Sequence, residues 1–191
     1  MNRPLLLLAL CQGFFLTNNV VFIAINGLVG LQLAPLGWMA TLPVTGYVVG
    51  SALSAGLVAK TQSHFGRKRS FQFGLVIAAL SAALCAYAAV TKNFWLLVAA
   101  TVVAGYYNAN AALYRFAGPE LVAPEHKERA ISLVLAGGIL GAFAGPNLAS
   151  ATRSMLDVPF AAAYLSLVVV ALLSLVVLSL IQFPEHHAPL P

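Results

Sequence analysis

Uncharged polar side chains recur at helical spacing in two otherwise apolar stretches of this sequence. The two groups are Gln12, Asn19 and Asn26, seven residues apart, and Tyr107, Asn110 and Tyr114, three and four apart. Both spacings place the side chains near one face of a helix. Amides and phenols donate and accept hydrogen bonds, so the two faces suit contact with a neutral polar solute. The alternative is that these groups bond to one another and stabilise a helix bundle.

No catalytic or metal-binding constellation can be drawn from the sequence. The histidines and acidic residues all fall in predicted loops or in the C-terminal tail. They form no nucleophile–histidine–acid set and no pair of intramembrane carboxylates. Cys11 and Cys85 lie too far apart in sequence for a recognisable metal or redox motif. We therefore expect neither an enzyme nor a resident metal or cofactor.

The composition is that of an integral membrane protein. Of the 191 residues 61% are hydrophobic and only 8% are charged, whereas a soluble domain has about 25% charged residues. Runs of about 20 apolar residues can cross a bilayer, and helices satisfy their backbone hydrogen bonds within lipid. The sequence predicts six such spans, at Leu5–Leu33, Leu36–Ala59, Phe71–Val90, Phe94–Phe116, Ala130–Thr152 and Phe160–Phe183. We expect an all-α bundle over residues 1–183, with an uncleaved first span and a cytoplasmic tail over 184–191.

The basic residues are distributed unevenly between alternate ends of the predicted spans. Eight of the ten lie at Arg3 and in the loops after spans two and four, and Lys92 and Arg153 lie in the loops between. Basic residues stay on the cytoplasmic side. We therefore expect both termini in the cytoplasm and the chain in the plasma membrane, the inner membrane of a bacterium. The net charge of +5 then reflects topology, and lipid rather than nucleic acid is the expected partner.

Two motifs carry a family resemblance. The turn after span two reads Phe65-Gly66-Arg67-Lys68-Arg69, and span five carries small residues at intervals of four, at Gly137, Gly141 and Gly145-Pro146. The turn resembles the signature Gly-x-x-x-Asp-Arg-x-Gly-Arg-Arg/Lys of the major facilitator superfamily of transporters. The glycine stripe resembles the signature of that family's fifth span. The chain departs from the first signature at Ser63, where the family has aspartate, and at His64, where it has arginine.

The resemblance implies one half of such a transporter, with six helices arranged as two inverted triplets. In the family, spans one and four line the central cavity, in agreement with the two polar faces. Spans one and four would then supply the solute contacts, and the glycine stripe would meet a helix of the other half. The family's aspartate clamps the two halves together at the cytoplasmic side, and Ser63 puts that clamp in doubt. Arg129 resembles the arginine of the loop that enters span five.

Arg115 is the deepest charge in the predicted spans. We expect its side chain to extend to the cytoplasmic surface, with pairing to Glu120 as the alternative. No carboxylate or histidine lies at depth in these spans, although proton coupling usually needs such a group. Coupling would then have to come from a second half, or the chain would act as a facilitator.

The function predicted from the sequence is transport of a small polar solute by alternating access. This requires a twelve-helix unit, made by a homodimer or with a separate second half. One alternative is a membrane accessory subunit that keeps the fold without transporting. Another is an importer of copper or another metal ion, and a third is that the chain is a fragment.

Overall fold

The computed structural model describes residues 2–184 and contains six long helices that could each cross a membrane. The elements are α1 (Arg3–Leu33), η1 (Gly37–Thr41), α2 (Leu42–Phe65), α3 (Arg67–Thr91), α4 (Phe94–Ala111), α5 (Tyr114–Ala117), η2 (Gly118–Leu121), η3 (Pro124–His126), α6 (Lys127–Thr152) and α7 (Ala161–Ser179). The prediction of an all-α membrane protein with six spans is confirmed. The predicted tail from residue 185 onward lies outside the described residues.

Two span boundaries differ from the prediction in ways that matter for the polar residues. Helix α2 continues past the predicted end at Ala59 to Phe65, so most of the basic turn is helical. Gly66 alone separates α2 from α3, at φ 85°, a left-handed conformation that glycine adopts without a steric penalty. The fourth span is broken, because α4 ends at Ala111 and the chain resumes as the short helix α5.

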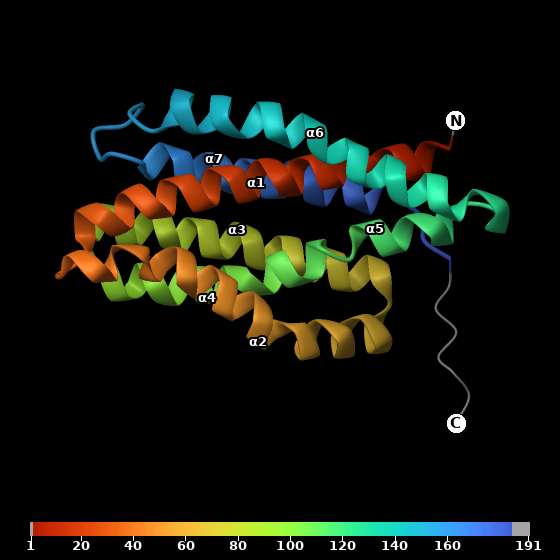
Figure 1. Cartoon of the computed structure of the whole chain (residues 1–191), viewed down its shortest axis with the longest axis horizontal. Coiled ribbons are helices and arrows are strands. Elements are labelled where there is room, and N and C mark those ends of the chain that lie inside the picture. The colour runs from red at the N-terminus through yellow and green to blue at the C-terminus, as the bar shows by residue number, and fades with distance from the viewer. Residues whose placement is uncertain (1, 185–191) are drawn as a thin grey trace.

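The helices pair in a pattern with two-fold character (Figure 1). Helix α1 packs against α6 and α7, α4 packs against α2 and α3, and α3 and α7 pack against each other. If α1, α2 and α3 are matched with α4, α6 and α7 in turn, the α1–α6 pair corresponds to α4–α2, the α1–α7 pair corresponds to α4–α3, and the α3–α7 pair corresponds to itself. This is the pattern that two triplets of helices produce when a two-fold axis relates them.

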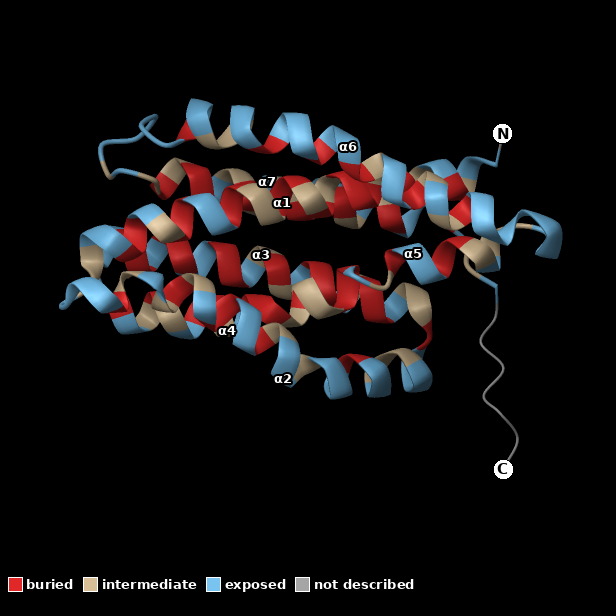
Figure 2. Ribbon diagram, viewed as in Figure 1, coloured by how far each residue is buried: buried red, intermediate tan, exposed pale blue. Residues whose placement is uncertain are grey.

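The buried side chains form two clusters along the bundle. One surrounds Leu8, Phe15 and Phe71, and the other surrounds Phe22 and Tyr164. Helices α2 and α6 are the least buried of the six spans. Figure 2 shows that α6 and half of α2 present mostly exposed residues, whereas α1 and α3 carry long buried faces.

The basic residues gather at one end of the bundle, which we call the basic end. The start of α1, the α2–α3 turn and the segment from α5 to α6 all lie at this end (Figure 1). The α3–α4 and α6–α7 connections, with Lys92 and Arg153, lie at the other end. The fold therefore keeps the eight-to-two charge separation predicted from the sequence.

Candidate functional site

Four polar side chains connect three helices in the middle of the bundle. The Tyr47 hydroxyl on α2 donates a hydrogen bond to Oδ1 of Asn19 on α1. Asn19 Nδ2 donates to Oδ1 of Asn108 on α4, at 3.2 Å. Asn108 Nδ2 donates to the Ser51 hydroxyl, back on α2, at 3.1 Å. We call Tyr47, Asn19, Asn108 and Ser51 the polar chain, and each member lies in the central part of its span.

Glycine brings the helices of the polar chain together. At Gly50 and Gly105 the backbones of α2 and α4 meet so closely that a Cβ atom on either glycine would overlap backbone atoms of the other helix. Small residues allow such close approach between membrane helices. Ser51 and Asn108 flank this contact, and their side chains are therefore close enough to bond.

The polar chain retains unused hydrogen-bonding capacity. Asn19 and Asn108 are both half-buried, and each uses one of the two N–H groups of its amide. Among the described residues no acceptor is recorded for the second N–H of either amide. The Ser51 hydroxyl accepts a hydrogen bond from Asn108. Its own O–H group remains a donor for which no acceptor is recorded among the described residues. These three side chains can therefore offer donors to a solute that reaches them.

The other residues of the two predicted polar faces lie deeper in the bundle. The Tyr164 hydroxyl donates to Asn26 at 2.7 Å, which joins α7 to α1. Tyr107 and Tyr114 pack edge to face against Phe15 in the core. Gln12 is 7% exposed and lies beside Gly138 of α6. Contact between a solute and Gln12, Asn26, Tyr107 or Tyr114 stays a prediction.

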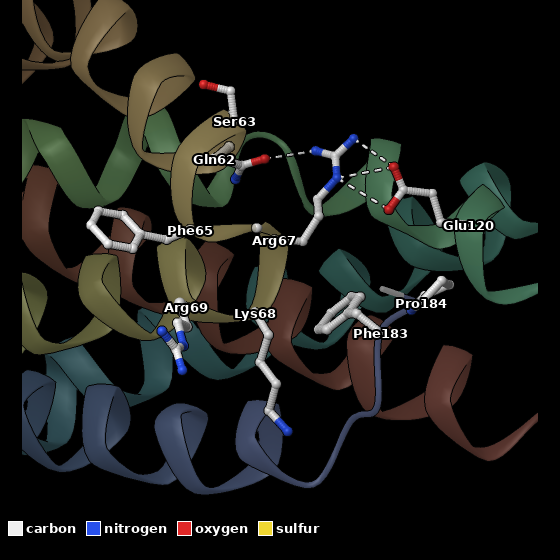
Figure 3. Close-up of a pocket in the computed structure, with 10 residues that line it drawn as sticks. Gln62, Ser63, Phe65, Arg67, Lys68, Arg69, Glu120, Phe183 and Pro184 are labelled. Atoms are coloured by element: carbon white, nitrogen blue, oxygen red, sulfur yellow. Dashed lines mark hydrogen bonds and ion pairs between the residues drawn. The ribbon is translucent and has the colours of Figure 1, made fainter. Parts of the chain in front are cut away.

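Asn110 joins a second polar cluster near the basic end. Its Nδ2 donates to the Ser70 carbonyl oxygen at 2.6 Å, and its Oδ1 accepts from Gln62 at 3.0 Å. Gln62 in turn accepts from Arg67 at 2.9 Å. Arg67 pairs with Glu120 at 2.9 Å (Figure 3). We call Asn110, Ser70, Gln62, Arg67 and Glu120 the basic-end cluster, and it ties the α2–α3 turn to α4 and to η2.

Three other residues predicted for the cytoplasmic side, Ser63, Arg115 and Arg129, are exposed. Ser63 is exposed and donates to the Lys60 carbonyl oxygen of its own helix. Arg115 is exposed and lies over the Phe116 ring, 4.8 Å from its centroid. The Glu120 carboxylate pairs with Arg67, and no ion pair between Arg115 and Glu120 is recorded among the described residues. Arg129 is exposed in the first turn of α6.

The glycine stripe of α6 packs against α1 of the same bundle, whereas the resemblance implied contact with a helix of a second half. A Cβ atom on Gly137 would overlap the Ala9 carbonyl oxygen, and one on Gly141 would lie 2.7 Å from that of Gly13. One on Gly145 would lie 2.7 Å from Cβ of Val20. Pro146, the next residue, is exposed. The glycines of the stripe therefore form the packing contact between α6 and α1.

Comparison with known proteins decides the family. The sequence profile of the Major Facilitator Superfamily matches residues 5–191. The chain belongs to this superfamily. The family match and the six apolar helices make it a multi-pass membrane protein. Among residues 2–184 no three His, Cys, Asp or Glu side chains come together as a metal site.

The superfamily relatives found are named as transporters. The riboflavin transporter RfnT of Brucella anthropi is 32% identical over 185 residues, which are 96% of this chain and 46% of that protein. YdeG of Bacillus subtilis, an uncharacterized MFS-type transporter, is 26% identical over 147 residues, 77% of this chain and 34% of that protein. The chain thus spans less than half the length of each of these relatives.

Sequence reasoning missed three members of the polar chain in this superfamily half: Tyr47, Ser51 and Asn108. Asn108 was visible as a polar residue of span four, but helical spacing favoured the face of Tyr107 and Asn110. A signal for the face that meets α2 was present in Gly105 and Gly50, which mark where α4 and α2 touch. Polar residues next to such a contact are the ones that can reach a neighbouring helix.

Proposed function

We propose that this chain forms one six-helix half of a membrane transporter for a small, polar, uncharged organic solute, and that flavins are the first class to test. The polar chain carries this proposal. It consists of uncharged side chains, it lies at mid-span, and it has hydrogen-bond donors to spare. Transporters of this architecture bind their substrates near the midplane of the bilayer.

The flavin class is suggested by the relative whose name specifies a substrate. RfnT is a riboflavin transporter and matches 96% of this chain. Riboflavin has ring carbonyl oxygens and ring nitrogens that accept hydrogen bonds, together with several hydroxyl groups. The unused N–H groups of Asn19 and Asn108 are donors of the matching kind.

A single bundle provides only one wall of a cavity, so we propose that a second six-helix half completes the transporter. The exposed face of α6 and the exposed residues in the first part of α2, such as Val48 and Val49, are the surfaces proposed for that contact. The second half would be another copy of this chain or a separate set of six helices. Alternating access would then consist of the two bundles rocking about the polar chain. In this arrangement the basic end faces the cytoplasm of a bacterial cell.

Uptake of labelled riboflavin tests the solute. The chain would be expressed in a bacterium that cannot make or import riboflavin, alone and together with the part of RfnT outside the matched region. We expect uptake above the empty vector in at least one of these two strains. Asn108→Leu should lower that uptake about tenfold or more, because it removes amide groups that the solute would use. The matched control is Asn147→Leu, since Asn147 is exposed and its amide donates to its own helix.

Two results would contradict the proposal. One is equal uptake by Asn108→Leu and Asn147→Leu, which would remove the polar chain from the solute path. The other is no uptake of riboflavin in either strain while the protein is folded in the membrane, which would exclude the flavin class. The mass of the particle in native lipid then separates a dimer or mixed complex from a monomer, and a strictly monomeric particle would exclude a two-bundle cavity.

A further inference from the structure

A pocket at the basic end is lined by three cationic side chains and one carboxylate. It has a volume of about 620 Å³, and the turn residues Arg67, Lys68 and Arg69 line it together with Glu120, Phe183 and Pro184. Arg67 and Glu120 form the one ion pair recorded among residues 2–184. Figure 3 shows Lys68 and Arg69 directed away from that pair. Two cationic side chains in this pocket therefore have no carboxylate partner within the described part of the chain.

The pocket adjoins two apolar hollows on the surface of the membrane-spanning region, with which it shares lining residues. A first hollow shares Phe65 and Arg69 with the pocket and continues along α3 past Phe73. A second hollow of about 440 Å³ shares Phe65 and Phe73 with the first and extends between α2, α3 and α4 as far as Val103. We call these two hollows the apolar trough. Its walls are mostly apolar, with exposed rings at Phe65 and Phe73.

On α4 the trough and the proposed solute site are formed by different sides of the helix. Successive residues of a helix turn by about 100°, so Val103 and Asn108 point to sides of α4 that differ by about 140°. Asn108 bonds to Asn19 of α1, while Val103 lines the trough. On α4 the polar chain and the apolar trough therefore lie on different sides of the helix.

The length of the trough matches one leaflet. From Arg69 to Ile77 the trough follows nine residues of α3, a rise of about 12 Å between the first and the last. The hydrocarbon of one leaflet is roughly 15 Å thick, half of the bilayer core. A molecule with an anionic head and an apolar tail can thus place its head on Lys68 and Arg69 and its tail in the trough.

We propose that this surface binds an anionic glycerophospholipid from the leaflet at the basic end. The phosphate lies between Lys68 and Arg69, and one acyl chain lies in the apolar trough between α2 and α3. The charge of the pocket selects an anionic headgroup over a zwitterionic one, since unpaired cations near a membrane surface attract anionic lipid. The apolar trough selects a lipid over a free phosphate compound, which has nothing to place there.

Native mass spectrometry of the purified chain tests this assignment. Phosphatidylglycerol and phosphatidylcholine with identical acyl chains are added at equal concentration, and bound lipids are counted. We expect retention of phosphatidylglycerol to exceed that of phosphatidylcholine. The double variant Lys68→Gln/Arg69→Gln should lower phosphatidylglycerol retention roughly 30-fold, since each cation near the surface contributes a factor of about five. The matched control Lys127→Gln/Arg129→Gln removes the same charge at the same end, outside the pocket, and should retain the lipid.

The trough has its own test. Val103→Trp should fill the second hollow and lower phosphatidylglycerol retention without changing the cations. Val176→Trp, at an exposed valine of α7, is its control. Thermal unfolding of each variant establishes that the bundle is intact.

Three outcomes would overturn the proposal. Equal retention of the two lipids would show that the pocket does not select an anionic headgroup. Equal losses in the two double variants would show that total charge, not this pocket, attracts the lipid. Glycerol phosphate displacing phosphatidylglycerol at comparable concentration would show that the headgroup binds without the trough.

Discussion

The α1–α6 and α2–α4 contacts are counterparts in the two triplets, but they differ in chemistry. Both depend on glycine, since Gly137 and Gly141 bring α6 onto α1 while Gly50 and Gly105 bring α2 onto α4. The α2–α4 contact adds the polar chain on one side and reaches the basic-end cluster. Among the described residues of α6, the recorded side-chain hydrogen bonds stay within that helix. The two contacts thus share a backbone geometry, and among the recorded hydrogen bonds only the α2–α4 contact has bonds between side chains of its two helices.

The largest expected effect comes from adding a methyl group to these contacts. Gly137→Ala and Gly50→Ala should each destabilise the bundle by about 1–3 kcal/mol or more, because the added Cβ overlaps backbone that cannot move aside easily. Gly56→Ala is the control, since no atom lies within 4 Å of a Cβ placed there. Unfolding in mixed micelles measures all three. If only one of the two contacts were sensitive, their shared dependence on glycine would be disproved.

A smaller effect is expected when the buried amide of the basic-end cluster is removed. Asn110→Leu leaves the Ser70 carbonyl oxygen and the Gln62 amide without their partner, and should cost about 1–2 kcal/mol of unfolding free energy. Asn147→Leu on the exposed face of α6 should stay within about 0.5 kcal/mol of the parent protein. The same unfolding assay compares the two. Equal costs would mean that the amide at position 110 contributes no more than an exposed one.

The smallest expected effect is the coupling between Arg67 and Glu120. A double-mutant cycle with Arg67→Gln and Glu120→Gln should give a coupling of about 0.5–1 kcal/mol, because both side chains remain partly exposed to solvent. The coupling should shrink at high salt, where screening weakens exposed pairs. A coupling of zero at low salt would show that the turn is held by Asn110 and Gln62 without this pair.

The sequence predicted the six spans because their length and apolar content are properties of each segment alone. It could not predict the rotation of each helix about its own axis. Tyr107 and Asn108 are adjacent, yet one lies in the core and the other bonds to α1 and α2. Spacing within one helix finds a face, but the neighbouring helices decide which face is buried. In this bundle the close approach of α2 and α4 at Gly50 and Gly105 determines which face of α4 meets α2.

The basic turn shows the same limit at longer range. The signature resemblance located the turn and identified Ser63 in place of the family's aspartate. It did not reveal that Arg67 would find its carboxylate at Glu120, 53 residues further along the chain. Such a partner becomes visible only when α4, α5 and η2 are placed beside the turn.

The single-residue joint at Gly66 fixes the angular phase of α3 with respect to α2. No further residue separates the two helices. The directions of the Arg67, Lys68 and Arg69 side chains around α3 are therefore determined by this joint. Arg67 is directed to Glu120, while Lys68 and Arg69 are directed away from it. One inserted residue would advance α3 by about 100°. It would therefore redistribute the three cations around the helix rather than merely lengthen the loop.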